Sequence, residues 1–441
     1  MANADLERAN ELKKNLVNFV YDAEGDLAIA LETYVAQQGS RDRAGYDIRQ
    51  QNLVFDTFLS EGIVNEQTTS ELFLENQSDL TKQDDALIKG WQNSFTGLFE
   101  VIKIPPQGFE VMNWLTAKHY TVFPSSEVSE SDTKRWQPGD IILTRIAPIN
   151  EKEWMFSGAS ILKGNLGKPK LAVALGEFKK NYPNCLYSDA PELLEQAWES
   201  VTTYHEEFVE FFGRDRVTLS GYQLNKKLSE LQEKMRQKRF ADAGIDSSKS
   251  LQEIAKEKGI DEEDMKAAAT EAGADAATVA KTLESKLNSP MVTPDVALPD
   301  RIKKAENATA FSHPRWGQTI LPTYHKFTTI LEAEEPQENE EAIVKKYLED
   351  TQINYFIWQQ LKSEFPTQLE TKIQKILQRP DFNLDRDLEA LLLEFNKPLE
   401  PELPEIASVP LHLHNLFEEA VARVNKSKSK KKKKKAVKGF K

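Results

Sequence analysis

The stretch that decides the fold reads Leu98-Phe-Glu-Val-Ile-Lys-Ile104, then Pro105-Pro-Gln-Gly108, then Phe109-Glu-Val-Met-Asn-Trp-Leu115. Its two outer parts are rich in β-branched and aromatic residues, and the Pro and Gly residues between them mark a turn. Three further short runs of this kind follow, at Tyr120 to Phe123, Ile141 to Ile146 and Trp154 to Phe156. Five short strands in about sixty residues predict a small antiparallel β-barrel, because closing the sheet removes its exposed edges.

Helical patterns occupy most of the chain outside this stretch, because apolar residues recur there at three- and four-residue steps. The expected fold class is therefore α+β, a predominantly helical multi-domain protein with one small antiparallel β-barrel. We expect the following segments: an N-terminal helical bundle (1–93), a small β-barrel-like domain (94–180), a helical segment (185–240), an Ala/Glu/Lys-rich helical hairpin module (241–290), an extended, Pro-punctuated segment (291–331), an acidic linker (332–341), a C-terminal helical region (342–425) and a disordered polylysine tail (426–441).

Two of these segments rest on composition and on short local patterns. In 291–331, Gln318 to Leu321 and Phe327 to Leu331 are expected to be extended, between prolines. Segment 332–341 holds six Glu in ten residues around Pro336, which is typical of a solvated linker.

Charge is unevenly distributed along the chain. The sequence holds 57 Lys and Arg against 70 Asp and Glu, a formal net charge of −13. Residues 426–441 contain ten Lys and no acid, so the rest of the chain carries a net charge of −23. An acidic body therefore ends in a basic tail, and such a tail is not expected to fold alone because like charges repel.

Several classes of protein are excluded by what the sequence lacks. No run of 18 apolar residues is present, so we expect no membrane span, and the charged N-terminus does not resemble a secretory signal. The single cysteine, Cys185, excludes an internal disulfide and favours a reducing cytoplasm. His205 with its neighbouring Glu residues, and the pair His412 and His414, fall short of a zinc ligand set. We therefore predict no metal, no cofactor and no enzymatic activity.

Residues 250–272 form the most specific local motif. Ser250-Leu-Gln-Glu-Ile-Ala-Lys-Glu-Lys-Gly-Ile-Asp-Glu-Glu-Asp-Met-Lys266 resembles the helix-turn-helix family at Ala255, Gly259 and Met265, its small, turn and apolar positions. The resemblance implies a DNA-binding regulator. The second helix, however, would begin Asp261-Glu-Glu-Asp264, and these acids would repel phosphates. A structural or protein-binding hairpin is the alternative.

The barrel region carries a second resemblance. Residues 95–160, with Gly108-Phe-Glu-Val111, Trp136-Gln-Pro-Gly-Asp140 and Trp154-Met-Phe-Ser-Gly158, resemble the small β-domain of uncharacterised bacterial proteins that end in a SecA-type cysteine-rich zinc motif. That zinc motif has no counterpart here, since Cys185 stands alone. Small barrels also bind nucleic-acid strands through aromatic faces. Here two interpretations are open for the aromatic residues of this region: they contact a nucleic-acid strand, or they fill the interior of the barrel. We favour the second. The residues are Phe109, Trp114, Tyr120, Trp136 and Trp154.

A third cluster combines His313-Pro-Arg-Trp-Gly317 with Tyr324-His-Lys-Phe327. Histidines, basic residues and aromatic rings at this density can stack on and hold a nucleotide or phosphate. They also occur where a strand packs at a domain junction, which we favour. An enzyme with a site assembled around His313, Arg315 and His325 is a further alternative.

The lysine tail provides the clearest functional indication. A lysine run of this kind binds a polyanion such as RNA, DNA or the ribosome, or an anionic membrane surface. The alternatives are that the tail docks on the acidic body of the same chain or that it only increases solubility. The sequence thus favours a non-catalytic cytoplasmic binding or accessory factor, which contacts the polyanion through the tail and a protein partner through the folded body. The predicted nucleic-acid-binding residues are Lys426, Lys428, Lys430, Lys431, Lys432, Lys433, Lys434, Lys435, Lys438 and Lys441.

Overall fold

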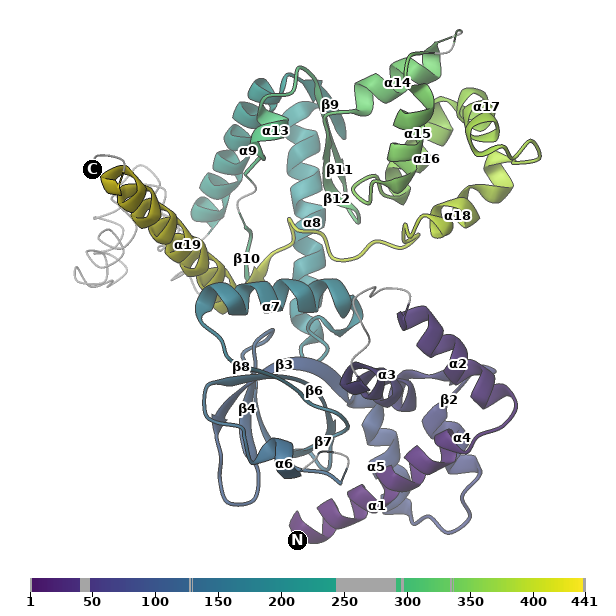
Figure 1. Ribbon diagram of the computed structural model, residues 1–441, viewed down its shortest axis with the longest axis vertical. Coiled ribbons are helices and arrows are strands. Elements are labelled where there is room, and N and C mark those ends of the chain that lie inside the picture. Colours follow the sequence, from purple (N-terminus) through teal and green to yellow (C-terminus); the bar gives the residue numbers. More distant parts are fainter. Residues whose placement is uncertain are drawn as a thin grey trace. The chain divides into compact units, whose positions relative to one another are not determined.

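The computed structural model describes residues 2–39, 48–126, 128, 130–242, 291–294, 297–333, 335 and 337–438. The chain forms two compact units, and Figure 1 labels most of their helices and strands. The first unit comprises residues 1–194 and 412–441, and the second comprises residues 195–411. In sequence, the second unit is therefore an insertion into the first. From residue 243 on, the helical module expected at 241–290 lies outside the described residues.

The N-terminal part of the first unit is helical, as the periodicity predicts. Two capping boxes define helix starts, since Thr68 with Glu71, and Thr81 with Asp84, exchange hydrogen bonds between side chain and backbone. The elements are α1 (Ala2–Tyr21), α2 (Asp26–Gly39), α3 (Ile48–Glu61), β1 (Ile63–Val64), β2 (Gln67–Thr68), α4 (Thr69–Glu75), α5 (Lys82–Gly90) and the 3₁₀ turn η1 (Trp91–Asn93).

A closed barrel follows directly, and it confirms the expected fold class. The strands of the ring pair in the order β3-β4-β5-β7-β6, and β6 pairs again with β3. All of these pairings are antiparallel except that of β5 with β7, which is parallel. The elements are β3 (Phe95–Lys103), β4 (Phe109–Asn113), β5 (His119–Phe123), α6 (Glu130–Thr133), β6 (Asp140–Pro148) and β7 (Glu153–Phe156), with β8 (Ile161–Asn165) added to the first half of β6.

The interior of the barrel is filled by side chains. On β3, β4 and β6 the residues of this core lie two or four positions apart, so they share one face of each strand, as the period of two requires. They are Phe95, Phe99, Val101, Phe109, Val111, Val122, Val128, Trp136, Ile142, Ile146 and Phe156. The first unit is completed by α7 (Lys168–Asn181), the 3₁₀ turn η2 (Pro183–Cys185), the first residues of α8 (Pro191–Phe212) and α19 (Leu411–Lys438).

The second unit combines small sheets with a helical cluster. Strands β12, β11 and β9 form an antiparallel sheet in that order, and β10 pairs with β13. The elements are β9 (Arg216–Leu219), α9 (Gly221–Asp242), β10 (Met291–Val292), α13 (Asp300–Lys303), β11 (Ala308–His313), β12 (Gly317–Leu321), α14 (Tyr324–Glu332), α15 (Glu340–Glu349), α16 (Tyr355–Glu364), α17 (Pro366–Leu377), α18 (Leu384–Glu394) and β13 (Val409–Pro410).

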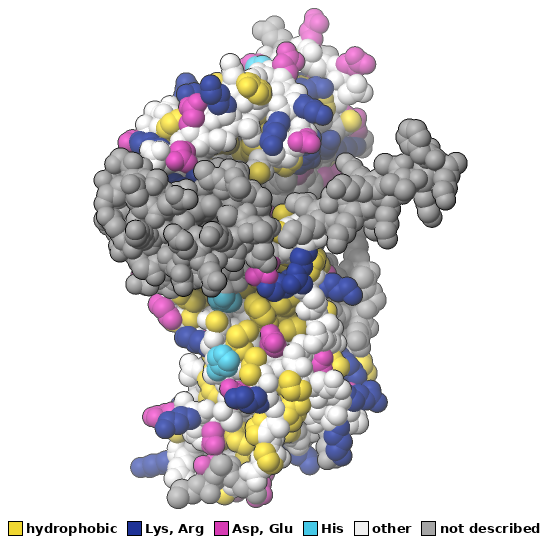
Figure 2. Space-filling view, turned by 90° about the vertical axis from the view of Figure 1, so that its left-hand side faces the viewer, with side chains coloured by type: hydrophobic (Ala, Val, Ile, Leu, Met, Phe, Trp, Pro, Cys, Tyr) yellow, Lys and Arg dark blue, Asp and Glu magenta, His cyan; other side chains and the backbone are white. Residues whose placement is uncertain are grey.

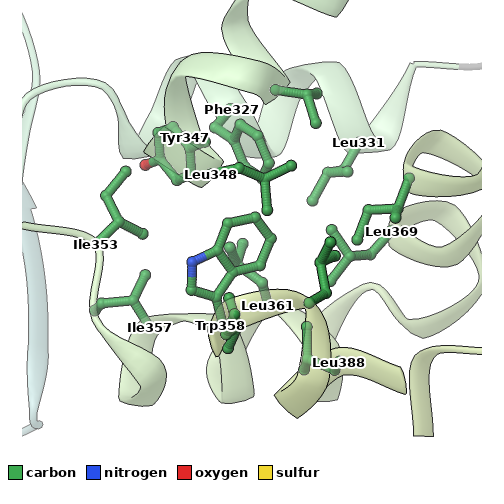
Figure 3. Close-up of a cluster of buried hydrophobic side chains, with 14 of the residues drawn as sticks. Phe327, Leu331, Tyr347, Leu348, Ile353, Ile357, Trp358, Leu361, Leu369 and Leu388 are labelled. Carbon is green, nitrogen blue, oxygen red and sulfur yellow. The ribbon is translucent and has the colours of Figure 1, made fainter. Parts of the chain in front are cut away.

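Helices α14 to α18 enclose the core of the second unit. Trp358 lies at its centre and is fully buried, with side chains from all five helices around it (Figure 3). The rings of Phe327 and Tyr347 stack with their centroids 3.9 Å apart, and both lie edge-on to Trp358. The apolar residues that recur at helical spacing in this part of the sequence are those that face this core.

Two expectations for the region before this core are corrected. Phe327 to Leu331 is part of helix α14 and is not extended. Among its buried residues, Tyr324, Phe327, Thr328 and Leu331 recur at helical spacing, which outweighs the β-branched pair Thr328-Thr329. The acidic linker is shorter than 332–341, because Glu332 ends α14 and Glu340 begins α15. Glu340 is buried, and its carboxylate pairs with Lys372 at 2.8 Å.

Candidate functional site

Helix α19 carries the predicted nucleic-acid-binding lysines, and its first turns are attached to the first unit. The Nε2 atom of His412 lies 2.8 Å from the carbonyl oxygen of Trp114 and must donate to it. Burial lowers the pKa of His412, which favours the neutral ring. Lys168 of α7 pairs with Glu419. The buried residues of this anchored part are Leu413, Leu416 and Ala420.

The lysine run continues this helix. Nine of the ten predicted lysines lie between Lys426 and Lys438, within α19, while Lys441 lies outside the described residues. At a rise of 1.5 Å per residue, this segment is about 18 Å long, so it carries one lysine for about every 2 Å of its axis. Double-stranded DNA carries one phosphate charge per about 1.7 Å. The two linear charge densities are comparable and opposite in sign.

The disordered tail expected for 426–441 is corrected as far as Lys438, because the backbone there is helical. Lysine has a good intrinsic helix propensity, and a helix that has already begun at Leu411 needs no new nucleus. Cations near a helix C-terminus also interact favourably with the helix dipole. Repulsion between lysines four residues apart opposes these effects, so a bound polyanion would stabilise the segment.

The barrel presents little of its aromatic surface. Phe109 and Trp136 are buried in its core, with ring centroids 5.0 Å apart. Tyr120 and Trp154 pack against the same core. Trp114 is the exception, because it lies beside His412 and its Nε1 donates to Glu100. Four of the five aromatic residues thus fill the barrel, which is the interpretation the sequence favoured.

His313 shapes the turn between β11 and β12. Its Nδ1 accepts hydrogen bonds from the backbone N–H of Arg315 at 3.0 Å and of Trp316 at 3.1 Å. Its ring lies 4.5 Å from that of Phe356, centroid to centroid. Burial lowers the pKa of His313, and the neighbouring His205 acts in the same direction. The neutral ring with its proton on Nε2 is therefore favoured.

Two side chains of this turn lie against aromatic rings of other elements. The guanidinium carbon of Arg315 lies 4.1 Å from the ring centroid of Trp198, and the ring of Trp316 lies 6.3 Å from that of Tyr355. Arg315 is exposed, whereas Trp198 and Trp316 are half-buried. Within the described part of the chain, the Arg315 guanidinium has no carboxylate partner. Sequence reasoning had identified this turn, but not Trp198, which lies more than one hundred residues earlier.

The structure brings together only part of the site suggested for an enzyme. His313 and Arg315 share the turn, but His325 lies on α14 with an exposed side chain and contacts neither of them within the described residues. No group of three or more His, Cys, Asp or Glu residues is arranged to hold a metal ion in the described part of the chain. Residues 250–272 lie outside the described residues, so the helix-turn-helix prediction stays a prediction. Among the described helices, none has the length and apolarity needed to cross a membrane.

A hollow of about 810 Å³ opens on the first unit between α1, α2, β1 and α4. Its lining combines an apolar floor, which includes Phe19 and Leu27, with side-chain amides and the carboxylates of Asp22, Glu24 and Asp26. Three large apolar residues of the same elements are exposed: Tyr21, Ile29 and Ile63. Figure 2 shows another face of the molecule, on which hydrophobic side chains also gather over the first unit.

Two buried cations of the first unit are invisible in the sequence pattern. Lys13 on α1 pairs with Asp56 on α3 at 2.7 Å, with side-chain exposures of 2% and 5%, and Ser157 also donates to that carboxylate. Arg145 on β6 is fully buried and donates to Ser94 and Glu61. Both ion pairs connect residues more than forty positions apart, so no local signal predicts them. The Arg145–Glu61 pair joins the barrel to α3, whereas the Lys13–Asp56 pair joins two helices of the bundle.

Cys185 lies near the second of these pairs. Burial raises the pKa of its thiol to about 11, and the carboxylate of Glu61 contributes in the same direction. At pH 8 about one thiol in a thousand is then ionised, against about one in four for an ordinary cysteine. We expect alkylation of the native protein by iodoacetamide at pH 8 to be slower than that of the unfolded chain by a factor of one hundred or more. Equal rates, measured by mass spectrometry, would contradict this prediction.

Comparisons with known proteins add one match. A family model described as a family of unknown function, DUF7986, matches residues 7–217, which include the N-terminal helices, the barrel, α7, α8 and the start of β9. No curated protein and no solved structure matches the chain.

Proposed function

We propose that this protein is a non-catalytic cytoplasmic binding or accessory factor that contacts a polyanion, either RNA, DNA or the ribosome, through the lysine-rich part of α19, and a protein partner through its folded body. The observation that carries the proposal is the construction of α19. Its first turns are anchored by His412, Leu413, Leu416 and Ala420, and the same helix continues to Lys438 with nine lysines beyond the anchor.

The charge distribution supports the assignment of polyanion binding to the tail and protein binding to the body. Without residues 426–441, the chain has a net charge of −23, so the body as a whole repels a polyanion and the lysine segment provides the main electrostatic attraction. A helix anchored at one end and bearing about one positive charge per 2 Å releases counterions from a nucleic acid in the same way as a basic arm. For the protein partner, the proposal assigns the hollow lined by Phe19 and Leu27, because α1, α2 and β1, which contribute to its lining, also carry exposed apolar residues that fit an interface.

Truncation after Asn425 tests the proposal. The intact protein should bind double-stranded RNA and DNA with an affinity that falls by about 10³ or more between 50 and 200 mM salt, the range expected for six or more phosphate contacts. The truncated protein should lose most of this affinity and most of its salt dependence, as measured by fluorescence anisotropy. Replacement of Lys430 to Lys435 by Gln should have an intermediate effect. If truncation leaves affinity and salt dependence unchanged for both nucleic acids, the proposal is wrong.

A further inference from the structure

We infer that Trp198, Arg315 and Trp316 form a second nucleic-acid contact, on the second unit, that stacks on unpaired bases of a single strand. This inference rests on the proposed function and specifies its ligand, since the lysine segment recognises charge alone. The observation that carries it is the conformation of the β11–β12 turn, in which an exposed guanidinium, without a carboxylate partner among the described residues, lies over a half-buried tryptophan.

The turn is held in a defined conformation. The Nδ1 atom of His313 accepts both backbone N–H groups that precede the Arg315 and Trp316 side chains. Gly317 follows with a φ of +67°, and a Cβ atom there would lie 2.6 Å from Pro404. A turn fixed at both ends presents its side chains at little further entropic cost, which favours binding. His313 is a positioning residue in this arrangement.

The polar groups of the turn are hydrogen-bond donors. The Arg315 guanidinium offers N–H groups only, as do the indole nitrogens of Trp198 and Trp316. His313 uses its Nδ1 within the turn, so its Nε2 is left as a donor. A ligand that suits this set supplies acceptors, such as the phosphate oxygens and base carbonyls of a nucleic acid. Asp215 lies close enough to His313 to influence its pKa, so the donors are not entirely free of negative charge.

The planar guanidinium and indole groups of the turn favour a single strand over a duplex. An Arg guanidinium over an indole presents its outer face, and bases stack on both guanidinium planes and indole rings. In a duplex these base faces are already occupied by neighbouring pairs, so they are unavailable to the turn. An acidic peptide without aromatic residues would satisfy the donors but offers no ring to stack. The ligand that uses both features is therefore single-stranded nucleic acid.

The lysine segment of the same chain makes a weak stacking contact sufficient. A strand that is held by α19 has a raised effective concentration at any second contact on the protein, provided that it is long enough to span both. One or two stacked bases then add to the affinity without a tight site of their own. Salt should weaken the lysine contact more strongly than the stacking contact.

Binding of a fluorescein-labelled twelve-residue oligouridylate to full-length protein tests the inference. Arg315→Gln and Trp316→Ala should each weaken binding by roughly ten-fold, as expected for the loss of one stacked base. Trp316→Phe should restore most of the affinity, because a ring remains. Tyr222→Ala removes an aromatic side chain of the same unit that is 75% exposed and lies on α9, and it should bind like the parent.

Inorganic polyphosphate carries negative charge but no bases, so its binding distinguishes the lysine contact of α19 from the stacking contact of the β11–β12 turn. Trp316→Ala should bind it like the parent protein, and Arg315→Gln, which also removes a donor to phosphate, should lose clearly less affinity for it than for oligouridylate. Truncation after Asn425 should weaken the binding of both probes. If Arg315→Gln and Trp316→Ala bind oligouridylate normally, or lose both probes equally, the stacking site is wrong even when truncation has its effect. If truncation affects neither probe, it is the proposed function that fails.

Discussion

Replacing Lys13 by Met is expected to lower the free energy of unfolding of the first unit by about 3–5 kcal/mol, because it leaves the Asp56 carboxylate buried without its cation. Ser157 would remain as a hydrogen-bond donor to Oδ1, but Oδ2 of Asp56 has no partner among the described residues. Urea unfolding followed by circular dichroism, with hydrogen exchange of α1 and α3, measures the loss.

The double variant Lys13→Met with Asp56→Leu identifies the cause. Because both charges are then absent, much of the lost stability should return. Lys89→Ala is the matched control, since Lys89 and Asp85 form an exposed pair at 3.0 Å that solvent screens, and we expect little change. A double variant that is no more stable than Lys13→Met would show that packing, rather than the unpaired carboxylate, is responsible.

In the second unit, Trp358→Ala should have an effect of similar size, about 3–5 kcal/mol. The indole is fully buried between α14, α15, α16, α17 and α18 (Figure 3), and its removal leaves a cavity that neighbouring rings such as Phe327 and Tyr347 cannot fill without moving. Thermal or urea unfolding, with hydrogen exchange of α14 to α18, provides the measurement.

Two further variants distinguish the cavity from a lost hydrogen bond. The Nε1 atom of Trp358 has no hydrogen-bond partner in the described part of the chain, so Trp358→Phe should cost much less than Trp358→Ala. Leu393→Ala on α18 removes a side chain that is 55% exposed and should change stability little. A loss for Trp358→Phe as large as that for Trp358→Ala would contradict the cavity explanation.

Local signals account for most of what the sequence predicted correctly. The strands from Phe95 to Phe156 alternate and are separated by turn residues, so the barrel follows from neighbours in sequence. The parallel pairing of β5 with β7 does not, because it joins Thr121 to Glu153 across thirty residues. Strand β9 was missed for the same reason, since it lies between two helices and pairs with β11 some ninety residues later.

In the candidate sites, too, contacts between residues far apart in the sequence could not be predicted. The lysine segment is evident from composition alone, whereas only the structure shows that it continues a helix whose first turn bonds to Trp114. The histidine, arginine and tryptophan of the β11–β12 turn were visible as a cluster, but their stacking partner Trp198 is on α8. The Lys13–Asp56 pair joins two helices that each look ordinary, so sequence alone offers no reason to single it out.

The insertion of the second unit has a consequence for synthesis on the ribosome. Residues 1–194 emerge first, but the helix that bonds to Trp114 begins only after the whole of 195–411 has been made. More than two hundred residues must therefore be synthesised after the barrel before α19 can dock on the first unit. Bringing the two ends of this inserted segment together costs conformational entropy that a shorter connection would avoid. The lysine run follows the docking turns of α19 in the chain, so it leaves the exit tunnel only after the second unit has been synthesised.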